Sequence, residues 1–575
     1  MIRAVRRPAL AVALAVVGAT ALAACTTAPA PAPARSQGPA AHVDPATRAD
    51  LRTFYGQRLK WKACGNLQCA DLTVPMDYTH PANGRTFVLP VARAVTTGTA
   101  ARIGSVIVNP GGPGGSGVQS LLEEGMAESF TPKVRARFDV VSFDPRGVGG
   151  SSPALTCGKN EEPTDAATGP ASDGTTPEKT VPEEPAPEET AAEEPAPEET
   201  AAAAADPFFP RSETERADVL AEAKGEADAC SKASAGILRH VGTEDVARDM
   251  DVLRAALGES RVTYLGWSYG TSLGTAYAEQ FPRRVRAMVL DGAVDPALDW
   301  SQRAVSQGLG FRRAVDDYIA SCAEVAGDSC PGSTPEEIRT LIEGLFRKTA
   351  RDPLPVDGDE YGADASTLLD ALVLSMYTPE AQWKDLSEAL ADAGRGDGTK
   401  LARLAGAEDP APATDEDAES GAATDGSGDA DGPGTETPAD NSDAALQAVN
   451  CFDVPHPRDA EAYWKALARA DEAAGRYGTS TVTAALTCKD WPTTTREPHR
   501  VSAPGVPPVL VVGTTGDAAT PYEEAASLAS QFPGGTLLTY EGFGHTAYGR
   551  SNSCVTGHVD GYLIDLRTVP AGTTC

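Results

Sequence analysis

The stretch GWSYGTSLG, residues 266–274, contains the pattern G-x-S-x-G twice, with Gly270 shared between the two copies. A serine at the centre of this pattern can act as an acyl-transfer nucleophile if it lies on a sharp turn between a strand and a helix. The apolar run RVTYL, which ends just before Gly266, predicts that strand. Ser268 then lies on the turn, and Ser272 lies one helical turn further on. We therefore predict Ser268 as the nucleophile and a structural role for Ser272.

A nucleophilic serine needs a general base and a carboxylate that orients the base. Asp517 follows the apolar run PPVLVVGTTG and His545 follows TLLTYEGFG, so each stands at the carboxyl end of a predicted strand. The chain order Ser, Asp, His is the one associated with this turn. We predict that His545 takes the Ser268 proton and that Asp517 holds the tautomer of the imidazole. The other histidines lack this context and are interpreted as surface or packing residues: His42, His80, His240, His456, His499 and His558.

The glycine-rich stretch NPGGPGGSG, residues 109–117, follows another predicted strand. Glycines let backbone N–H groups point at a developing oxyanion, and we expect the donors to be the N–H groups of Tyr269 and Gly112. A phosphate-binding loop is the alternative, but the stretch has no G-K-[ST] ending and no G-x-G-x-x-G opening a helix. In the next glycine-rich stretch, FDPRGVGGSS, we expect Asp144 and Arg146 to form a structural pair.

The elements that must position these residues alternate between strands and helices. Short apolar runs predict strands at 105–110, 138–144, 261–266, 285–292, 507–517 and 535–545, and the apolar spacing within 245–257 predicts a helix. This alternation favours an α/β fold with a mainly parallel sheet and flanking helices. Between Trp300 and about Thr479 the sequence predicts amphipathic helices without intervening strands. We interpret that block as an inserted helical lid domain over the strand ends.

The chain has 575 residues and a formal net charge of −32. Lys159–Asp206 holds 14 acidic and 2 basic residues, and Glu408–Asp443 holds 12 acidic and no basic residues, which leaves −8 for the rest. Both segments lack aromatic residues and hydrophobic periodicity, and the first repeats EEPAPEETAA, so we expect disordered inserts. Solvated linkers are the favoured interpretation; cation binding or a cell-wall spacer has no ligand spacing to support it. The acidity says little about the substrate, and we expect no nucleic-acid partner.

The amino terminus reads as a targeting segment. MIRAVRR supplies positive charge, PALAVALAVVGATA is apolar, and LAAC ends at Cys25. The ending resembles a bacterial lipobox, in which the cysteine is lipidated; the alternative is an ordinary signal peptide cut at a nearby Ala-x-Ala site. We expect an exported protein, lipid-anchored through Cys25 to the outer face of the bacterial cytoplasmic membrane or secreted, with a Pro/Ala tether after the anchor.

The other ten cysteines fit an oxidising compartment, because their number is even and no C-x-x-C or paired histidine spacing suggests a metal. Sequence alone does not prove connectivity, but pairing between neighbours would close five loops. We expect disulfides rather than a metal site, and no cofactor. The neighbouring pairs are Cys64 with Cys69, Cys157 with Cys230, Cys322 with Cys330, Cys451 with Cys488, and Cys554 with Cys575.

Taken together, NPGGPGGSG, DPRGVGGSS, LGWSYGTSLGTAYAEQFP, VLDGAVDP, NCFDV…CKDWP, GDAATP and GFGHTAY…CV…YL…VPAGTTC resemble the exported tripeptidyl-aminopeptidase branch of the α/β-hydrolases, which is related to proline iminopeptidase. The resemblance covers roughly residues 55–155, 230–310 and 445–575. It departs where relatives often read D-P-x-T-P, since this chain has Asp517-Ala518-Ala519-Thr520-Pro521. A second departure is Trp267 beside the nucleophile, which either narrows the pocket or packs.

The resemblance implies an α/β-hydrolase fold in consecutive parts. We expect a signal peptide at 1–24, a tether at 25–55, core at 56–157, an acidic insert at 158–210, core with the nucleophile turn at 211–300, a helical lid at 301–480 containing an acidic insert at 405–445, and a carboxyl-terminal core part at 481–575.

The resemblance also implies peptide hydrolysis from a free N-terminus, through an acyl-enzyme on Ser268. Lid carboxylates would then attract the α-ammonium of the substrate. Asp453 and Glu461 are candidates, although Asp453 is equally well read as a turn or helix cap. The alternatives are a carboxylesterase acting on esters, thioesters or lipids with the same residues, and a catalytically dead binding lipoprotein, which the intact Ser268, Asp517 and His545 argue against. We expect a monomer.

Overall fold

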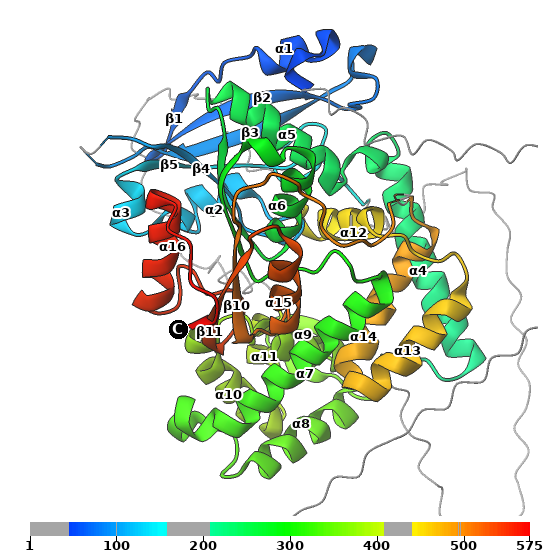
Figure 1. Ribbon diagram of the computed structural model, residues 1–575. Helices are drawn as coiled ribbons and strands as arrows, with labels where there is room; N and C mark the ends of the chain where they lie inside the picture. The colour runs from blue at the N-terminus through cyan, green and yellow to red at the C-terminus, as the bar shows by residue number, and fades with distance from the viewer. Residues whose placement is uncertain (1–44, 99–100, 158–207, 407–439, 493, 495) are drawn as a thin grey trace, which may run out of the picture. The chain divides into compact units, whose positions relative to one another are not determined.

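The computed structural model describes residues 45–98, 101–157, 208–406, 440–492, 494 and 496–575 (Figure 1). The signal peptide, Cys25, most of the tether and most of both acidic inserts therefore lie outside the described residues. The chain divides into two units, Met1–Arg48 and Ala49–Cys575. Of the first, the described part holds a short 3₁₀ turn, Pro45–Thr47. All that follows concerns the second unit.

A ten-stranded sheet forms the centre of the second unit, with strand order β1-β2-β3-β5-β4-β6-β7-β10-β11-β12. The first three strands pair antiparallel with their neighbours, and the pairs from β5 through to β12 are parallel. The strands are β1 Lys62–Cys64, β2 Leu67–Pro75, β3 Thr86–Ala94, β4 Gly104–Asn109, β5 Phe138–Phe143, β6 Val262–Trp267, β7 Val285–Asp291, β10 Leu510–Gly516, β11 Thr536–Phe543 and β12 Thr573–Thr574. The predicted mainly parallel sheet is confirmed.

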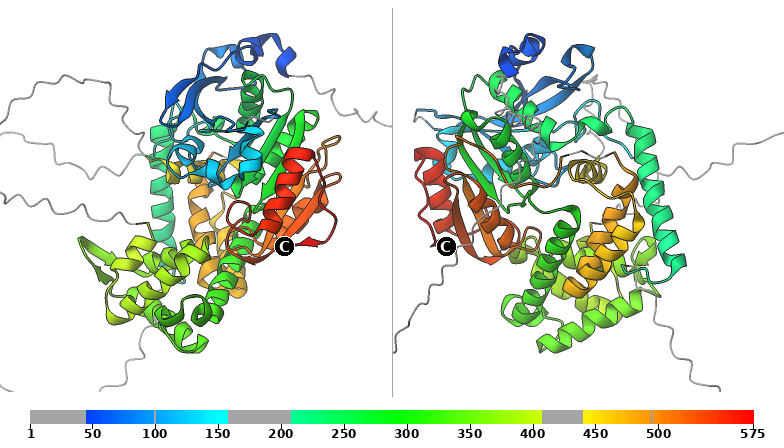
Figure 2. Two further views of the ribbon diagram at one scale, coloured as in Figure 1. Left: turned by 90° about the vertical axis from the view of Figure 1, so that its left-hand side faces the viewer. Right: turned by 45° about the vertical axis from the view of Figure 1, so that its right-hand side comes forward.

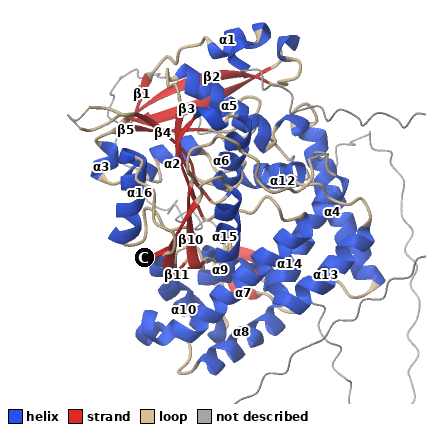
Figure 3. Cartoon of the chain, viewed as in Figure 1, coloured by secondary structure: helices blue, strands red, loops and turns tan. Residues whose placement is uncertain are grey.

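Both faces of the sheet are covered, because successive side chains of a strand point to opposite faces. Ile107 of β4 and Val511 of β10 pack with α5 (Thr243–Ala256), α6 (Tyr269–Gln280) and α15 (Tyr522–Gln531). Val106 and Val512, from the same strands, pack instead with α2 (Gly117–Leu122), α3 (Pro132–Arg135) and α16 (Ser553–Asp565). Figure 3 shows the two helix layers on either side of the sheet.

A block of helices is inserted between β7 and β10, and in both views of Figure 2 most of these helices gather at one end of the sheet. Most of them share a core of their own, which includes Tyr318 and Trp383 and reaches Ala518 and Ala519, just beyond the carboxyl end of β10. The helix at Ser442–Asp453 differs, because its Ala445, Ala448 and Val449 pack into the core beside α5 and α6. The predicted lid thus lies against the strand ends. Its helices are α7 Trp300–Val325, α8 Pro335–Thr349, α9 Ala365–Leu374, α10 Pro379–Arg395, α11 Thr399–Leu404, α12 Ser442–Asp453, α13 Ala460–Ala474 and α14 Arg476–Ala484.

The expectation of a lid without strands is wrong. Leu354–Val356 (β8) and Asp359–Ala363 (β9) form an antiparallel hairpin between α8 and α9. The pairing of Val356 with Asp359 leaves a two-residue Asp357–Gly358 loop, and Gly358 takes a positive φ of 81°. Asp-Gly is a strong hairpin signal, and the amphipathic helices on either side obscured it.

The expected pair between Asp144 and Arg146 is also wrong. Arg146 is fully buried and donates to both carboxylate oxygens of Asp249 on α5, at 2.7 and 2.6 Å. Asp144 instead accepts hydrogen bonds from Ser116 Oγ (2.7 Å) and from two backbone N–H groups. Residues two apart on a tight turn point in different directions, so Asp144 and Arg146 bind partners on different elements.

Candidate active site

The turn that carries Ser268 has the strained geometry expected of an exposed nucleophile. Ser268 sits between β6 and α6 with φ 55° and ψ −123°, outside the regions that non-glycine residues favour. The turn is so tight that a Cβ on Gly266 would lie 2.3 Å from the carbonyl oxygen of Gly270, and a Cβ on Gly270 would lie 2.9 Å from that of Asn109. The glycines on either side of Ser268 are therefore required by the fold.

Asp517 and His545 meet at the carboxyl ends of β10 and β11. His545 Nδ1 lies 2.8 Å from Asp517 Oδ1, and both side chains are buried. The same carboxylate accepts the N–H groups of Ala519 (3.0 Å), Thr520 (2.8 Å) and Thr546 (3.1 Å). An imidazole that donates from Nδ1 to a carboxylate keeps the lone pair of its other nitrogen, Nε2, available as a base.

His545 Nε2 is buried and has no hydrogen-bond partner among the described residues. Ser268 and His545 both line one cavity of about 350 Å³, so the predicted nucleophile and base face the same space. A hydrogen bond between them is not formed here; such bonds are often long or poorly aligned without substrate and tighten once it binds. The arrangement can perform acyl transfer with Ser268 as nucleophile.

The glycine-rich loop before α2 lies directly against the nucleophile. A Cβ on Gly111 would be 2.9 Å from Ser268 Cβ, so only glycine fits there. The N–H of Gly111 is engaged by Asn109 Oδ1 at 3.2 Å. The N–H of Gly112 makes no hydrogen bond within the described part of the chain. Gly112 therefore remains the better of the two glycines for the predicted oxyanion donor, together with Tyr269 at the start of α6.

The lid and the histidine loop contact each other at this cavity. The carbonyl of Tyr377 in the lid accepts the N–H of His545 at 2.9 Å, and its ring packs edge-on against the imidazole. Burial raises the pKa of Tyr377 to about 12. Arg550 donates to the carbonyl of His545 (3.0 Å) and to Glu380 of the lid (3.2 Å). Sequence reasoning missed Tyr377 and Arg550, because neither belongs to a pattern that predicts its neighbours in space.

A second cavity, of about 440 Å³, adjoins the first, and Pro110, Ser120 and Glu124 line both. Every charged side chain that lines this adjoining cavity is acidic: Glu123, Glu124, Asp144 and Asp440. Asp144 is buried, and its carboxylate already accepts hydrogen bonds from Ser116 and two backbone N–H groups. Glu123 and Glu124, in contrast, are exposed. The pair follows the glycine-rich loop in the sequence, and that adjacency was the signal that could have identified it.

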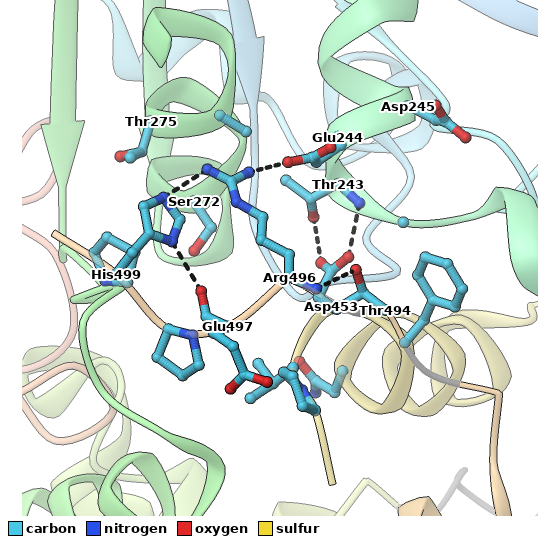
Figure 4. Close-up of a pocket in the computed structure, with 18 of the residues that line it drawn as sticks. Thr243, Glu244, Asp245, Ser272, Thr275, Asp453, Thr494, Arg496, Glu497 and His499 are labelled. Atoms are coloured by element: carbon cyan, nitrogen blue, oxygen red, sulfur yellow. Dashed lines mark hydrogen bonds and ion pairs between the residues drawn. The ribbon is translucent and has the colours of Figure 1, made fainter. Parts of the chain in front are cut away.

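Asp453 and Ser272 line a different cavity, of about 290 Å³, which shares no lining residue with the Ser268 cavity (Figure 4). Asp453 accepts the N–H (2.9 Å) and the hydroxyl (2.5 Å) of Thr243, and the same hydroxyl contacts the Tyr269 hydroxyl. Burial raises the pKa of Asp453 to about 6. The other lid candidate, Glu461, lies exposed on the first turn of α13, with Lys465 at 3.9 Å.

The ten described cysteines form five disulfides that join the neighbouring pairs along the chain. Cys554, His558 and Cys575 lie close enough together to hold a metal, but the two cysteines are bonded to each other and offer no thiolate. Within the described ranges, no helix combines the length and apolarity of a membrane span.

Strand order, the strained serine turn and the buried Asp–His pair define an α/β-hydrolase with a serine nucleophile. The chain belongs to this family: residues 104–549 match the family described as alpha/beta hydrolase fold. The predicted fold and the resemblance drawn from the motifs are thereby confirmed, and the protein is a serine hydrolase.

Three relatives are similar in sequence to this chain over most of its length. Serine protease Hip1 of Mycobacterium tuberculosis (strain ATCC 25618 / H37Rv) is 34% identical over 548 residues, covering 90% of this chain and 91% of the relative. Tripeptidyl aminopeptidase of Streptomyces lividans is 32% identical over 524 residues, covering 90% and 84%. Carboxylesterase B of the same Mycobacterium tuberculosis strain is 33% identical over 518 residues, covering 88% and 86%.

Proposed function

We propose that the protein is an exported serine peptidase that removes short peptides from the free N-terminus of its substrates, with Ser268, His545 and Asp517 as its catalytic triad. The relatives named serine protease and tripeptidyl aminopeptidase support peptide hydrolysis. The observation that supports specificity for a free N-terminus is the acidic lining of the cavity that adjoins the Ser268 cavity. A peptide with a free amine carries a cation there, and carboxylates attract it.

In the first half of the reaction, His545 Nε2 takes the proton of Ser268 Oγ while Oγ attacks the scissile carbonyl carbon. The carbonyl oxygen becomes an oxyanion, which the N–H groups of Tyr269 and Gly112 stabilise. Asp517 stabilises the imidazolium through Nδ1–H. His545 then gives the proton to the departing amine, the C–N bond breaks, and the N-terminal peptide remains bound to Ser268 as an ester.

In the second half, a water molecule replaces the departed amine. His545 takes a proton from it, and the resulting hydroxide attacks the ester carbonyl. The same N–H groups hold the second oxyanion, and its collapse returns the proton to Ser268 Oγ and releases the peptide with a new carboxylate.

Glu124 is the carboxylate best placed to bind the substrate ammonium. It lines both the Ser268 cavity and the adjoining cavity, is exposed, and makes no hydrogen bond or ion pair with a described residue. Asp453, the candidate from the sequence, is less suited, because its carboxylate is engaged by Thr243 and its cavity is separate.

The test compares two matched tripeptide reporters, one with a free amine and one N-acetylated, together with a short-chain ester and a Ser268→Ala control. We expect kcat/KM to fall at least about 100-fold on acetylation and the Ser268→Ala variant to be inert. Glu124→Gln should reduce kcat/KM about 10-fold for the free-amine reporter and leave the acetylated one unchanged, since one charge-assisted contact is lost.

Glu128→Gln is the matched control, because Glu128 is exposed nearby but pairs with Arg135 and lines neither cavity. Equal cleavage of the two peptides would contradict N-terminal specificity. Turnover of the ester alone would favour the carboxylesterase alternative, for which the relative named Carboxylesterase B is the supporting observation.

Export with lipidation at Cys25 is part of the proposal, supported by the lipobox-like LAAC at residues 22–25 and the even number of the remaining cysteines. Expression in a bacterial host should place the wild-type chain in the membrane fraction and Cys25→Ser in the soluble fraction. The same distribution for both chains would contradict the anchor.

A further inference from the structure

Asp291 is a buried carboxylate at the active site that the triad does not include. It is the last residue of β7, the neighbour of both β6 and β10, and its side chain is fully buried. Its carboxylate accepts the N–H of Ala547 at 3.0 Å to each oxygen and the N–H of Tyr548 at 2.7 Å. Its backbone carbonyl accepts the N–H of Ser268 at 2.9 Å. One residue therefore holds both the nucleophile turn and the loop of the base.

That loop is strained. In the described part of the chain, three non-glycine residues have a positive φ, and two of them, Ser268 (55°) and Thr546 (66°), are at this site. Strain of this kind, about 1–3 kcal/mol per residue, persists only where the surroundings impose it. Asp517 accepts the N–H of Thr546, and Asp291 accepts the next two N–H groups. Two carboxylates thus fix three consecutive amides directly after His545.

Asp291 also interacts electrostatically with His545 and Asp517. No lysine or arginine among the described residues forms an ion pair with it, and Asp517 and His545 are the charged groups that act most strongly on it. Burial raises its pKa to about 6, the Asp517 charge adds to this, and the two N–H donors and His545 oppose it. Above that pH, Asp291 is a second negative charge near the imidazole, in a low-dielectric setting where it favours the imidazolium.

We propose that Asp291 is a positioning residue for the acyl-transfer reaction, holding the Ser268 turn and the His545 loop in register and stabilising the imidazolium as it forms. The proposal rests on the triad assigned under the proposed function. It does not depend on whether the substrate is a peptide or an ester, because His545 changes its protonation state in both.

The test is Asp291→Asn, assayed with the free-amine tripeptide reporter, or with the ester if only that is cleaved. A displaced base lowers the rate without changing substrate binding, so we expect kcat to fall about 10- to 100-fold with KM changed less than about threefold. We also expect the acidic limb of the kcat/KM profile to move to lower pH, because the imidazolium loses a negative neighbour. Near-UV circular dichroism establishes that the variant is folded.

Asp291→Glu keeps the charge and moves it by one methylene, which supplies a second variant if Asp291→Asn fails to fold. It should lower kcat while leaving the acidic limb near its wild-type position. Asp139→Asn is the control for loss of a buried carboxylate away from the site. Asp139 is buried, accepts the N–H of Thr96 at 2.9 Å and pairs with Arg102 at 3.0 Å, and it lies at the opposite end of β5 from the active site.

A folded Asp291→Asn variant with wild-type kcat and an unchanged pH profile would overturn the positioning role, as would a folded Asp291→Glu variant with wild-type kcat. A loss equal to that of Asp139→Asn would show a general cost of removing a buried carboxylate and would also overturn it. An active Ser268→Ala enzyme would instead overturn the triad itself, so the two failures are distinguishable.

Discussion

Ser268 and Tyr269, which are adjacent in the sequence, line two different cavities, and the polar groups of these cavities differ in how they are paired. In the first, which Ser268 lines, His545 Nε2 is buried without a partner. In the second, shown in Figure 4, Arg496 pairs with Glu244 and with Glu279, and Asp453 is engaged by Thr243. An unpartnered buried polar atom costs about 1–3 kcal/mol, and in the first cavity this atom is the base of the proposed reaction.

Arg303 is an exception to this contrast. Its Nε also lines the second cavity, is buried and has no partner among the described residues, with Glu524, Asp453 and Asp295 acting on it at longer range. A guanidinium stays protonated and cannot accept a proton, whereas Nε2 of a neutral imidazole carries a lone pair. The first cavity therefore holds a histidine whose Nε2 is available as a base. In the second cavity, Arg303 cannot accept a proton, and the Nε2 of His499 is engaged by Arg496 and Glu279.

Removing the nucleophile or the base gives the largest expected effect. Ser268→Ala and His545→Ala should each lower kcat by at least about 10⁴-fold, because each removes a group that changes its bonding in the reaction. Steady-state kinetics on the free-amine reporter measures this, with folding checked by circular dichroism. Substantial activity in either variant would move the reaction away from this cavity.

The next largest difference is expected between substitutions of two buried carboxylates, one at each cavity. Asp517→Asn should lower kcat about 10³- to 10⁴-fold, because an amide no longer holds the imidazole in its reactive tautomer. Asp453→Asn, in the second cavity, should change kcat/KM less than about threefold. Comparable losses in both variants would mean that the second cavity takes part in the reaction, and would break the contrast.

Substitution of Asp453 should instead change how the free energy of unfolding depends on pH. Burial raises its pKa in the folded chain to about 6, so between pH 4 and pH 6 the folded state binds more protons than the unfolded state. The free energy of unfolding therefore falls as pH rises through this window. Denaturant titrations at pH 4.5 and 7.5 should show a decrease that is about 1–3 kcal/mol smaller in Asp453→Asn than in wild type. An identical decrease would place the carboxylate in a more solvated setting.

The smallest effect is expected for the second serine of the opening motif. Ser272 lines the second cavity rather than the first, so Ser272→Ala should leave kcat and KM within about twofold of wild type. The same reporter assay measures both constants. A loss close to that of Ser268→Ala would show that the nucleophile was assigned to the wrong serine.

The sequence was informative where function depends on backbone geometry. The strand before Gly266 and the two strands before Asp517 and His545 could be predicted because parallel strands are continuous apolar runs and their carboxyl ends meet at one edge. The structure accordingly brings Asp517 and His545 within 2.8 Å and gives Ser268 the expected turn.

Residues brought in by tertiary packing could not be predicted. Tyr377 and Arg550 contact His545 only because the lid packs on the histidine loop, and no local pattern encodes that contact. Asp144 and Arg146 were paired because they are close in sequence, yet their partners are on other elements. Asp291 was visible at the end of a predicted strand, but its role depends on a loop more than 250 residues later.

The position of the lid in the chain has a consequence for biosynthesis. Ser268 lies before the inserted helices, and Asp517 and His545 lie after them, so the ribosome makes the nucleophile long before the base. Until β10 has emerged and paired beside β7, and β11 beside β10, the nascent polypeptide has Ser268 but lacks His545, the base of the proposed triad. The order of synthesis thus supplies the base and the carboxylate of the proposed triad only when translation of the chain is nearly complete.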